Sequence, residues 1–118
     1  MINAIAIFIG GGIGALLRLY LLSALNSGPA INVLIVNVIG CCAMGALHAF
    51  FSSKGPFFAV FSIGILGSFT TMSAFTNNSL EIFISGKYLN AILYSLSMVI
   101  ICIMANIIGY IAIKKILG

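Results

Sequence analysis

Hydrophobic residues run through this chain in four long stretches, at 2–25, 31–51, 57–84 and 89–113. Each reaches the roughly 20 residues that a helix needs to cross the hydrocarbon core of a bilayer. Short segments rich in Gly, Pro, Ser, Asn and Lys separate the stretches, and none is long enough to hold a soluble domain. The pattern predicts an all-α membrane protein whose four transmembrane helices form one domain over residues 1–118.

Composition and charge support this picture. The chain is 63% hydrophobic and 5% charged, whereas soluble domains average roughly 45–50% apolar and about 25% charged residues. No charge precedes Arg18 in the first stretch, so it lacks the basic start of a cleaved signal peptide and is expected to be retained. The net charge of +4 forms no basic face with interleaved aromatic residues, which argues against nucleic-acid binding.

The lysines predict an orientation. With four spans, the N-terminus, Lys54 and the pair Lys114 and Lys115 share one side of the membrane, and Lys87 lies on the other. The positive-inside rule then places both termini in the cytoplasm.

Arg18 lies well inside the first stretch and Asn37 inside the second. Each is a functional hypothesis, because polar groups cost free energy inside a membrane. Arg18 also fits a snorkelling anchor, whose charged end reaches the interface. Asn37 also fits a hydrogen bond between helices. Gly10 and Gly14 form a G-x-x-x-G pattern that predicts close helix packing.

The third stretch has a polar interruption of its own. As one straight helix its 28 residues would span about 42 Å, more than a hydrocarbon core of roughly 30 Å. Gly64, Gly67 and the hydroxyl residues at 70–73 lie in its middle, so we expect a break there. Unwound backbone at that depth is tolerated where it is buried in protein or lines a watery cavity. The alternative is an unbroken helix whose Ser and Thr hydroxyls bond back to its own carbonyls.

Other polar residues give weaker signals. Cys41, Cys42 and Cys102 show neither a disulfide framework nor a metal-ligand spacing, and we expect them to be packing residues. His48 has no second ligand near it in the sequence, and Glu81 lies near the end of its stretch. No nucleophile, base and orienting group occur together, so the chain is not expected to be an enzyme.

Several motifs together resemble those of the Fluc (CrcB) family of fluoride channels. They are GGGIGALLRLY at 10–20, VNVIG at 36–40, GILGSFTTMSAF at 64–75 and GKYLNAILY at 86–94. Their order and spacing cover essentially the whole chain. The resemblance implies a multi-pass protein of a prokaryotic plasma membrane that lets fluoride leave the cytoplasm passively.

The family resemblance also implies an assembly and a set of sites. The subunits would form an antiparallel, dual-topology-type dimer with two narrow fluoride paths and one structural Na⁺ at its centre. The backbone carbonyls of Gly67 and Thr70 would bind the Na⁺. Asn37 would donate its amide to fluoride, Phe75 would present the positive edge of its ring, and Arg18 would be a fixed charge near the path.

Further path residues follow from the same resemblance. Hydroxyl groups are further donors that could replace the water of a strongly hydrated anion. The hydroxyl residues expected along the path are Thr71, Ser73, Tyr94 and Ser97, and Met72 is expected there as well.

The chain departs from the family pattern at five positions. Met72 stands where the family has a pore Phe, and Ala74 where it has a Thr. Val33, Asn78 and Met98 replace a usual Thr, Glu and Ser. Much of the expected hydroxyl track is therefore missing, although the positions for sodium remain.

Several interpretations stay open at this point. In the first, the chain is one subunit of a heterodimer with a paralogous chain in the opposite orientation. In the second, two copies of the chain form a divergent homodimer. In the third, the chain is a non-conducting structural membrane subunit. The unequal lysine distribution favours the heterodimer, because it fixes one orientation per chain. A small multidrug-type transporter has similar length, but it needs a carboxylate in the first helix, and no acid precedes Glu81.

Overall fold

A computed structural model describes residues 2–118, without the side chain of Ile2. The prediction of an all-α fold with four helices long and apolar enough to span a membrane is confirmed. The third span is divided into four consecutive segments. In chain order the elements are α1 (Ile2–Ala24), α2 (Pro29–Phe50), α3 (Pro56–Ala59), the π-helical η1 (Val60–Leu66), α4 (Gly67–Phe69), α5 (Met72–Ile84) and α6 (Tyr88–Leu117).

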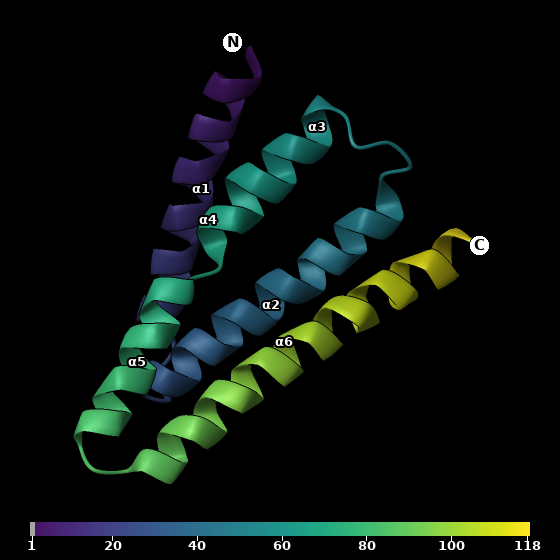
Figure 1. Cartoon of the computed structure of the whole chain (residues 1–118). Helices are drawn as coiled ribbons and strands as arrows, with labels where there is room; N and C mark the ends of the chain where they lie inside the picture. The colour runs from purple at the N-terminus through teal and green to yellow at the C-terminus, as the bar shows by residue number, and fades with distance from the viewer. Residues whose placement is uncertain (1) are drawn as a thin grey trace.

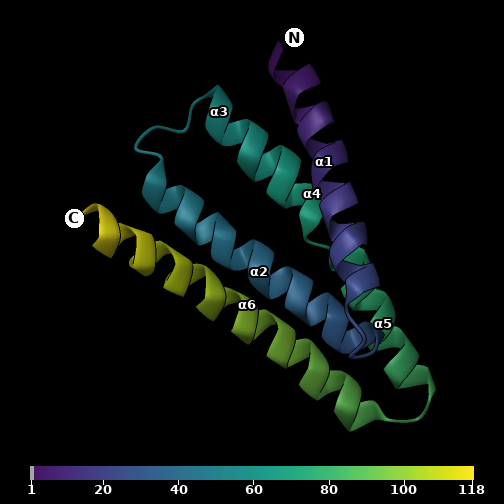
Figure 2. The same ribbon diagram turned by 180° about the vertical axis from the view of Figure 1, so that it is seen from behind.

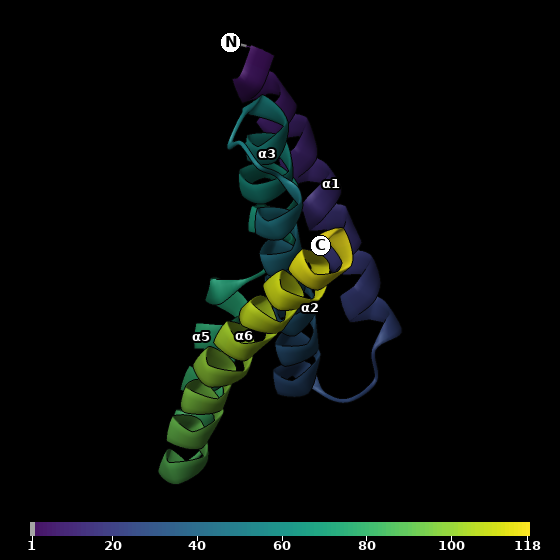
Figure 3. The same cartoon turned by 90° about the vertical axis from the view of Figure 1, so that its right-hand side faces the viewer.

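The elements form two pairs that open away from each other (Figure 1). One pair is α1 with α3, η1 and α4, and the other is α2 with α6. The view from behind shows α5 beyond the break, packed where the two pairs meet (Figure 2). From the side, α6 is strongly inclined to α1 (Figure 3). The break in the third span therefore lies at the junction of the two pairs.

Proline and glycine set most helix ends. The second and third spans begin at Pro29 and Pro56, slightly earlier than predicted, because proline suits the first turn of a helix. Gly28 and Gly86 have φ angles of 93° and 87°, which only glycine adopts readily. The fourth span runs to Leu117, four residues beyond the predicted 113, because no breaker occurs before the end and its lysines suit a helix C-terminus.

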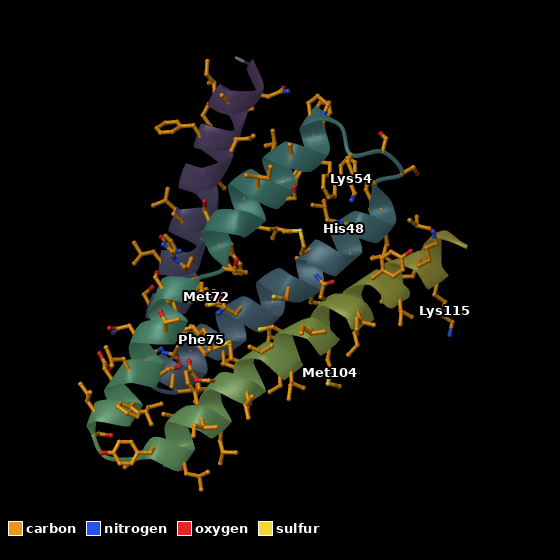
Figure 4. The ribbon with its side chains drawn as sticks, viewed as in Figure 1. His48, Lys54, Met72, Phe75, Met104 and Lys115 are labelled. Atoms are coloured by element: carbon orange, nitrogen blue, oxygen red, sulfur yellow. The ribbon has the colours of Figure 1, made fainter. Side chains whose placement is uncertain are left out.

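The lysines lie at the two ends of the bundle in the way the orientation prediction assumes. Lys54 and Lys115 lie at the end that also holds both termini (Figure 4). Lys87 lies in the turn between α5 and α6 at the opposite end (Figure 1).

Glycines bring the helix backbones into contact within each pair. A Cβ at Gly14 would collide with the Ile65 carbonyl of η1, and one at Gly10 would lie 3.2 Å from the Val60 oxygen. In the other pair, a Cβ at Gly45 of α2 would collide with the backbone of Asn106. Only small residues permit such close approach.

The break in the third span occurs at Thr70 and Thr71, not at the glycines. Both threonines have extended backbones, with ψ angles of 154° and 109°. Gly67 is helical, with φ −62° and ψ −33°, and Gly64 lies inside η1. The break therefore falls within the predicted region but at its hydroxyl residues, and the two glycines lie in helical backbone before it.

Candidate functional site

The break is held open by Asn37 of α2, which pairs with the backbone of Thr71. Asn37 Oδ1 accepts a hydrogen bond from the Thr71 amide at 2.8 Å, and Asn37 Nδ2 donates to the Thr71 carbonyl at 3.1 Å. Both residues are buried. One amide side chain thus satisfies both polar groups of an unwound peptide at membrane depth, where each would be costly to leave unpaired.

Arg18 of α1 satisfies a second backbone group beside the break. Its Nη1 donates to the Ser68 carbonyl at 2.9 Å. This carbonyl belongs to the last turn of the half-helix before the break, where the helix dipole favours a cation. Arg18 is half-buried and thus places its charge next to the break instead of extending it to the interface.

The hydrogen bond from the Thr71 N–H to Asn37 also leaves the Gly67 carbonyl without its usual helical donor. In a continuous α-helix the Thr71 N–H would donate to this oxygen, but that N–H is directed to Asn37 Oδ1. Gly67 is also exposed at the surface of the subunit. A carbonyl at a half-helix C-terminus without its helical donor is a typical ligand for a hard cation. The neighbouring Thr70 turns its hydroxyl back to the Leu66 carbonyl at 3.1 Å, so only its backbone is left to serve as a ligand.

Thr71 also starts the second half-helix. Its Oγ1 accepts a hydrogen bond from the Ala74 amide at 3.2 Å, which makes it the N-cap of α5. The hydroxyl lies 3.4 Å from the Ser73 Oγ. Thr71 therefore contributes its amide, carbonyl and hydroxyl to the structure of the break.

Replacing the cap tests this role. We expect Thr71→Val to lower the free energy of unfolding by about 1 kcal/mol, because the valine cannot accept from Ala74. Thr76→Val is the matched control, since the exposed Thr76 hydroxyl only donates to the Ser73 carbonyl within the same helix. Denaturant titrations in detergent micelles, followed by circular dichroism, measure both. Equal losses in the two variants would contradict the capping role.

A groove of about 280 Å³ lies beside the break. Asn37, Thr70 and Thr71 supply its polar atoms, and apolar and sulfur-containing side chains line the rest. Met72 and Phe75 come from the first turn of α5 (Figure 4). Met72 is 70% exposed at the surface, whereas Phe75 is buried and packs against Tyr94 with ring centroids 5.6 Å apart.

Met98 fills the inner side of this groove, at the position where the family pattern has Ser. It is only 4% exposed and forms a core cluster with Val33 and Phe75. Its sulfur lies 3.6 Å from Asn37 Nδ2. The amide nitrogen of Asn37 is therefore engaged by both the Thr71 carbonyl and a thioether.

The other predicted path residues do not all gather here. Ser97 is exposed and does not line the groove. Ser73 is also exposed. The Tyr94 hydroxyl donates to the Ala30 carbonyl at 3.1 Å, and buried Asn78 donates to the Pro29 carbonyl at 3.2 Å. Tyr94 and Asn78 thus tie α6 and α5 to the start of α2.

Sequence reasoning missed two supports of the break. A Cβ at Gly40 would collide with the Thr70 side chain, so this glycine makes room for the unwound segment. Met98 was recognised only as a missing hydroxyl, although its sulfur contacts Asn37. The VNVIG motif, which holds both Asn37 and Gly40 one turn apart, was the available signal for the first of these.

Comparisons with known proteins agree on one family. Residues 5–110 match the profile of the family described as CrcB-like protein, Camphor Resistance (CrcB). A Campylobacter jejuni protein named fluoride-specific ion channel FluC is 34% identical over 122 residues, covering 97% of this chain and 100% of the relative. A protein of the same name from Shewanella piezotolerans is 37% identical over 117 residues, covering 92% of this chain and 94% of the relative. Staphylococcus aureus has a similar protein, named fluoride-specific ion channel FluC 1, at 37% identity over 109 residues, which cover 87% of this chain and 89% of the relative.

Proposed function

This chain belongs to the CrcB family, and we propose that it forms a fluoride-selective channel in the plasma membrane of a prokaryote. The main support is that this chain aligns over nearly its whole length with relatives named as fluoride-specific ion channels. Fluoride that enters as HF ionises in a neutral cytoplasm, and the channel lets the trapped anion leave down its gradient. The protein is thus a passive channel and not an enzyme.

The groove beside the break supports a path for a small anion. Fluoride is strongly hydrated, so a path must replace its water with donors and with the positive edges of aromatic rings. The Thr71 and Ser73 hydroxyls lie 3.4 Å apart at the start of α5, one turn from the Phe75 ring. The half-helix N-terminus at α5 adds a favourable potential for an anion. Asn37 and Arg18 fix this arrangement from the two neighbouring helices.

A structural Na⁺ also fits the residues present. The Gly67 carbonyl has lost its helical donor and is exposed on the subunit surface, and carbonyl oxygens suit a hard cation. We assign the Gly67 and Thr70 carbonyls as its ligands. The cation would supply positive charge next to the fluoride path.

Two subunits in antiparallel orientation would complete the site. Gly67 and Met72 are exposed beside the break, so a second subunit would cover the open side of the groove. The Met98 sulfur occupies the space next to Asn37, and the lysines favour one orientation of this chain. We therefore favour a heterodimer with a paralogous chain, in which the partner retains the full set of donors.

An experiment that restores the missing donors distinguishes the heterodimer hypothesis from the homodimer hypothesis. In a bacterium that lacks its own fluoride channel, we expect the wild-type chain alone to give weak protection against fluoride. The triple variant Met72→Phe, Ala74→Thr and Met98→Ser should raise the tolerated fluoride concentration at least tenfold, because it removes the sulfur beside Asn37 and adds a ring and two hydroxyls. The measurement is growth across a fluoride series, with chloride at matched concentrations as the control. Full protection by the wild-type chain would overturn the heterodimer.

A further inference from the structure

Three sulfur-containing side chains from two helices, Cys41, Met98 and Cys102, line the same groove. The Cys102 Sγ donates toward the Met98 Sδ at 3.8 Å, one turn away on α6. Cys41 of α2 lines the same groove as Met98 and Cys102. Both cysteines are free thiols and are half-buried. The sequence spacing gave no sign of this cluster because its members are brought together only by the pairing of α2 with α6.

The two helices that carry the sulfurs cannot slide past each other. Gly45 packs on the backbone of Asn106, and Gly109 packs on the backbone of Cys42. The Asn106 side chain donates to the Cys41 carbonyl at 3.0 Å. The sulfur cluster is therefore held by a rigid frame, as a ligand site requires.

We propose that Cys41, Met98 and Cys102 bind one soft monovalent cation, of the class of Cu(I) and Ag(I). Thiolate and thioether sulfur are the ligands that such cations prefer. For metal–sulfur bonds of about 2.3 Å, two ligands at trigonal angles lie about 4 Å apart, close to the 3.8 Å between Cys102 and Met98. The groove has about 280 Å³ of space next to the sulfurs.

The charges of the site favour a monovalent ion. Binding replaces the proton of one thiol: Cys–SH and M⁺ give Cys–S–M and a proton, which passes to the buffer. The second thiol and the thioether bind as neutral donors. The loaded site is then neutral, which avoids the cost of a net charge at membrane depth. No carboxylate or imidazole lines the groove in the described part of the chain, so hard or divalent cations lack their usual ligands there.

Silver(I) tests the site without any measurement of ion flux, so its outcome is independent of the proposed function. Purified protein in detergent and chloride-free buffer is loaded with silver nitrate and then exposed to excess glutathione, which removes silver from single thiols. Silver retained per chain is measured by mass spectrometry. We expect about one silver per chain in the wild type, and at least a tenfold loss in Cys41→Ser, Cys102→Ser and Met98→Leu.

Two matched controls lie outside the cluster. Cys42→Ser removes the adjacent thiol, which does not line the groove. Met104→Leu removes a methionine that is 54% exposed and points away from the other helices (Figure 4). Both should retain silver like the wild type, and all variants should elute as the wild type does on size exclusion. No retained silver in the wild type, equal loss in the controls, or a Cys41–Cys102 disulfide in the protein purified without oxidant would overturn the inference.

Discussion

Asn37→Leu should remove more function than any other single substitution at the break. The leucine has a similar size but cannot pair with Thr71, so the Thr71 N–H and carbonyl are left without their partner in the membrane interior. Each unpaired group costs about 1–3 kcal/mol. We expect the free energy of unfolding to fall by about 3 kcal/mol. Fluoride efflux should fall at least a hundredfold, measured either in the heterodimer with the paralogous chain or in the triple variant Met72→Phe, Ala74→Thr and Met98→Ser.

The matched control is Asn106→Leu, which removes another intramembrane asparagine. The Asn106 side chain makes a single hydrogen bond, to the Cys41 carbonyl, and it does not line the groove beside the break. It should cost stability but leave efflux within a factor of about three. Denaturant titration in micelles and fluoride-electrode recordings from liposomes measure the two effects. If Asn106→Leu lowered efflux as much as Asn37→Leu, the special role of the Asn37 and Thr71 pair would be wrong.

Gly14→Ala should have the second largest effect, through folding. The added methyl would overlap the Ile65 carbonyl of η1, a rigid backbone atom that cannot rotate away. Overpacking of this kind costs about 1–3 kcal/mol, and we expect the upper end because α1 must separate from η1. The displacement would also withdraw Arg18 from the Ser68 carbonyl. Both the yield of monodisperse protein and efflux should fall at least tenfold.

Gly12→Ala provides the comparison on the same helix. Nothing lies within 4 Å of a Cβ at Gly12, so the methyl faces open space. Alanine forms helix better than glycine, by about 1 kcal/mol in soluble hosts, and Gly12→Ala should match or exceed the wild-type stability. Yield after size exclusion and thermal stability in detergent distinguish the two variants. A Gly14→Ala protein as stable as Gly12→Ala would show that α1 does not pack on η1 as described.

The sequence was sufficient to predict the four spans, because hydropathy alone marks helices in a bilayer. The excess length of the third stretch was a poor reason to expect a break, however. The fourth span has 30 residues and is one continuous helix. Length therefore does not force a helix to unwind. The third span is broken because Asn37 and Arg18 replace the helical partners of its backbone.

Those partners could not be assigned from the sequence. Asn37 lies 34 residues from Thr71, and Arg18 lies 50 residues from Ser68. Each residue was recognised as polar and costly in a membrane, but hydropathy does not say which backbone atom a side chain will reach. The sulfur cluster of Cys41, Met98 and Cys102 was missed for the same reason. The assignment of fluoride and sodium to particular residues remains a prediction.

We expect this fold, with its break held by Asn37 and Arg18, to conduct fluoride and exclude chloride. Efflux from liposomes tests it most directly, with a fluoride or chloride electrode, the wild-type chain and the variant Met72→Phe, Ala74→Thr and Met98→Ser. We predict that the triple variant releases trapped fluoride at least a hundredfold faster than chloride, with the wild-type chain slower. If neither protein released fluoride above the rate of empty liposomes, or if chloride and fluoride were released equally fast, the chain would not be a fluoride-selective channel.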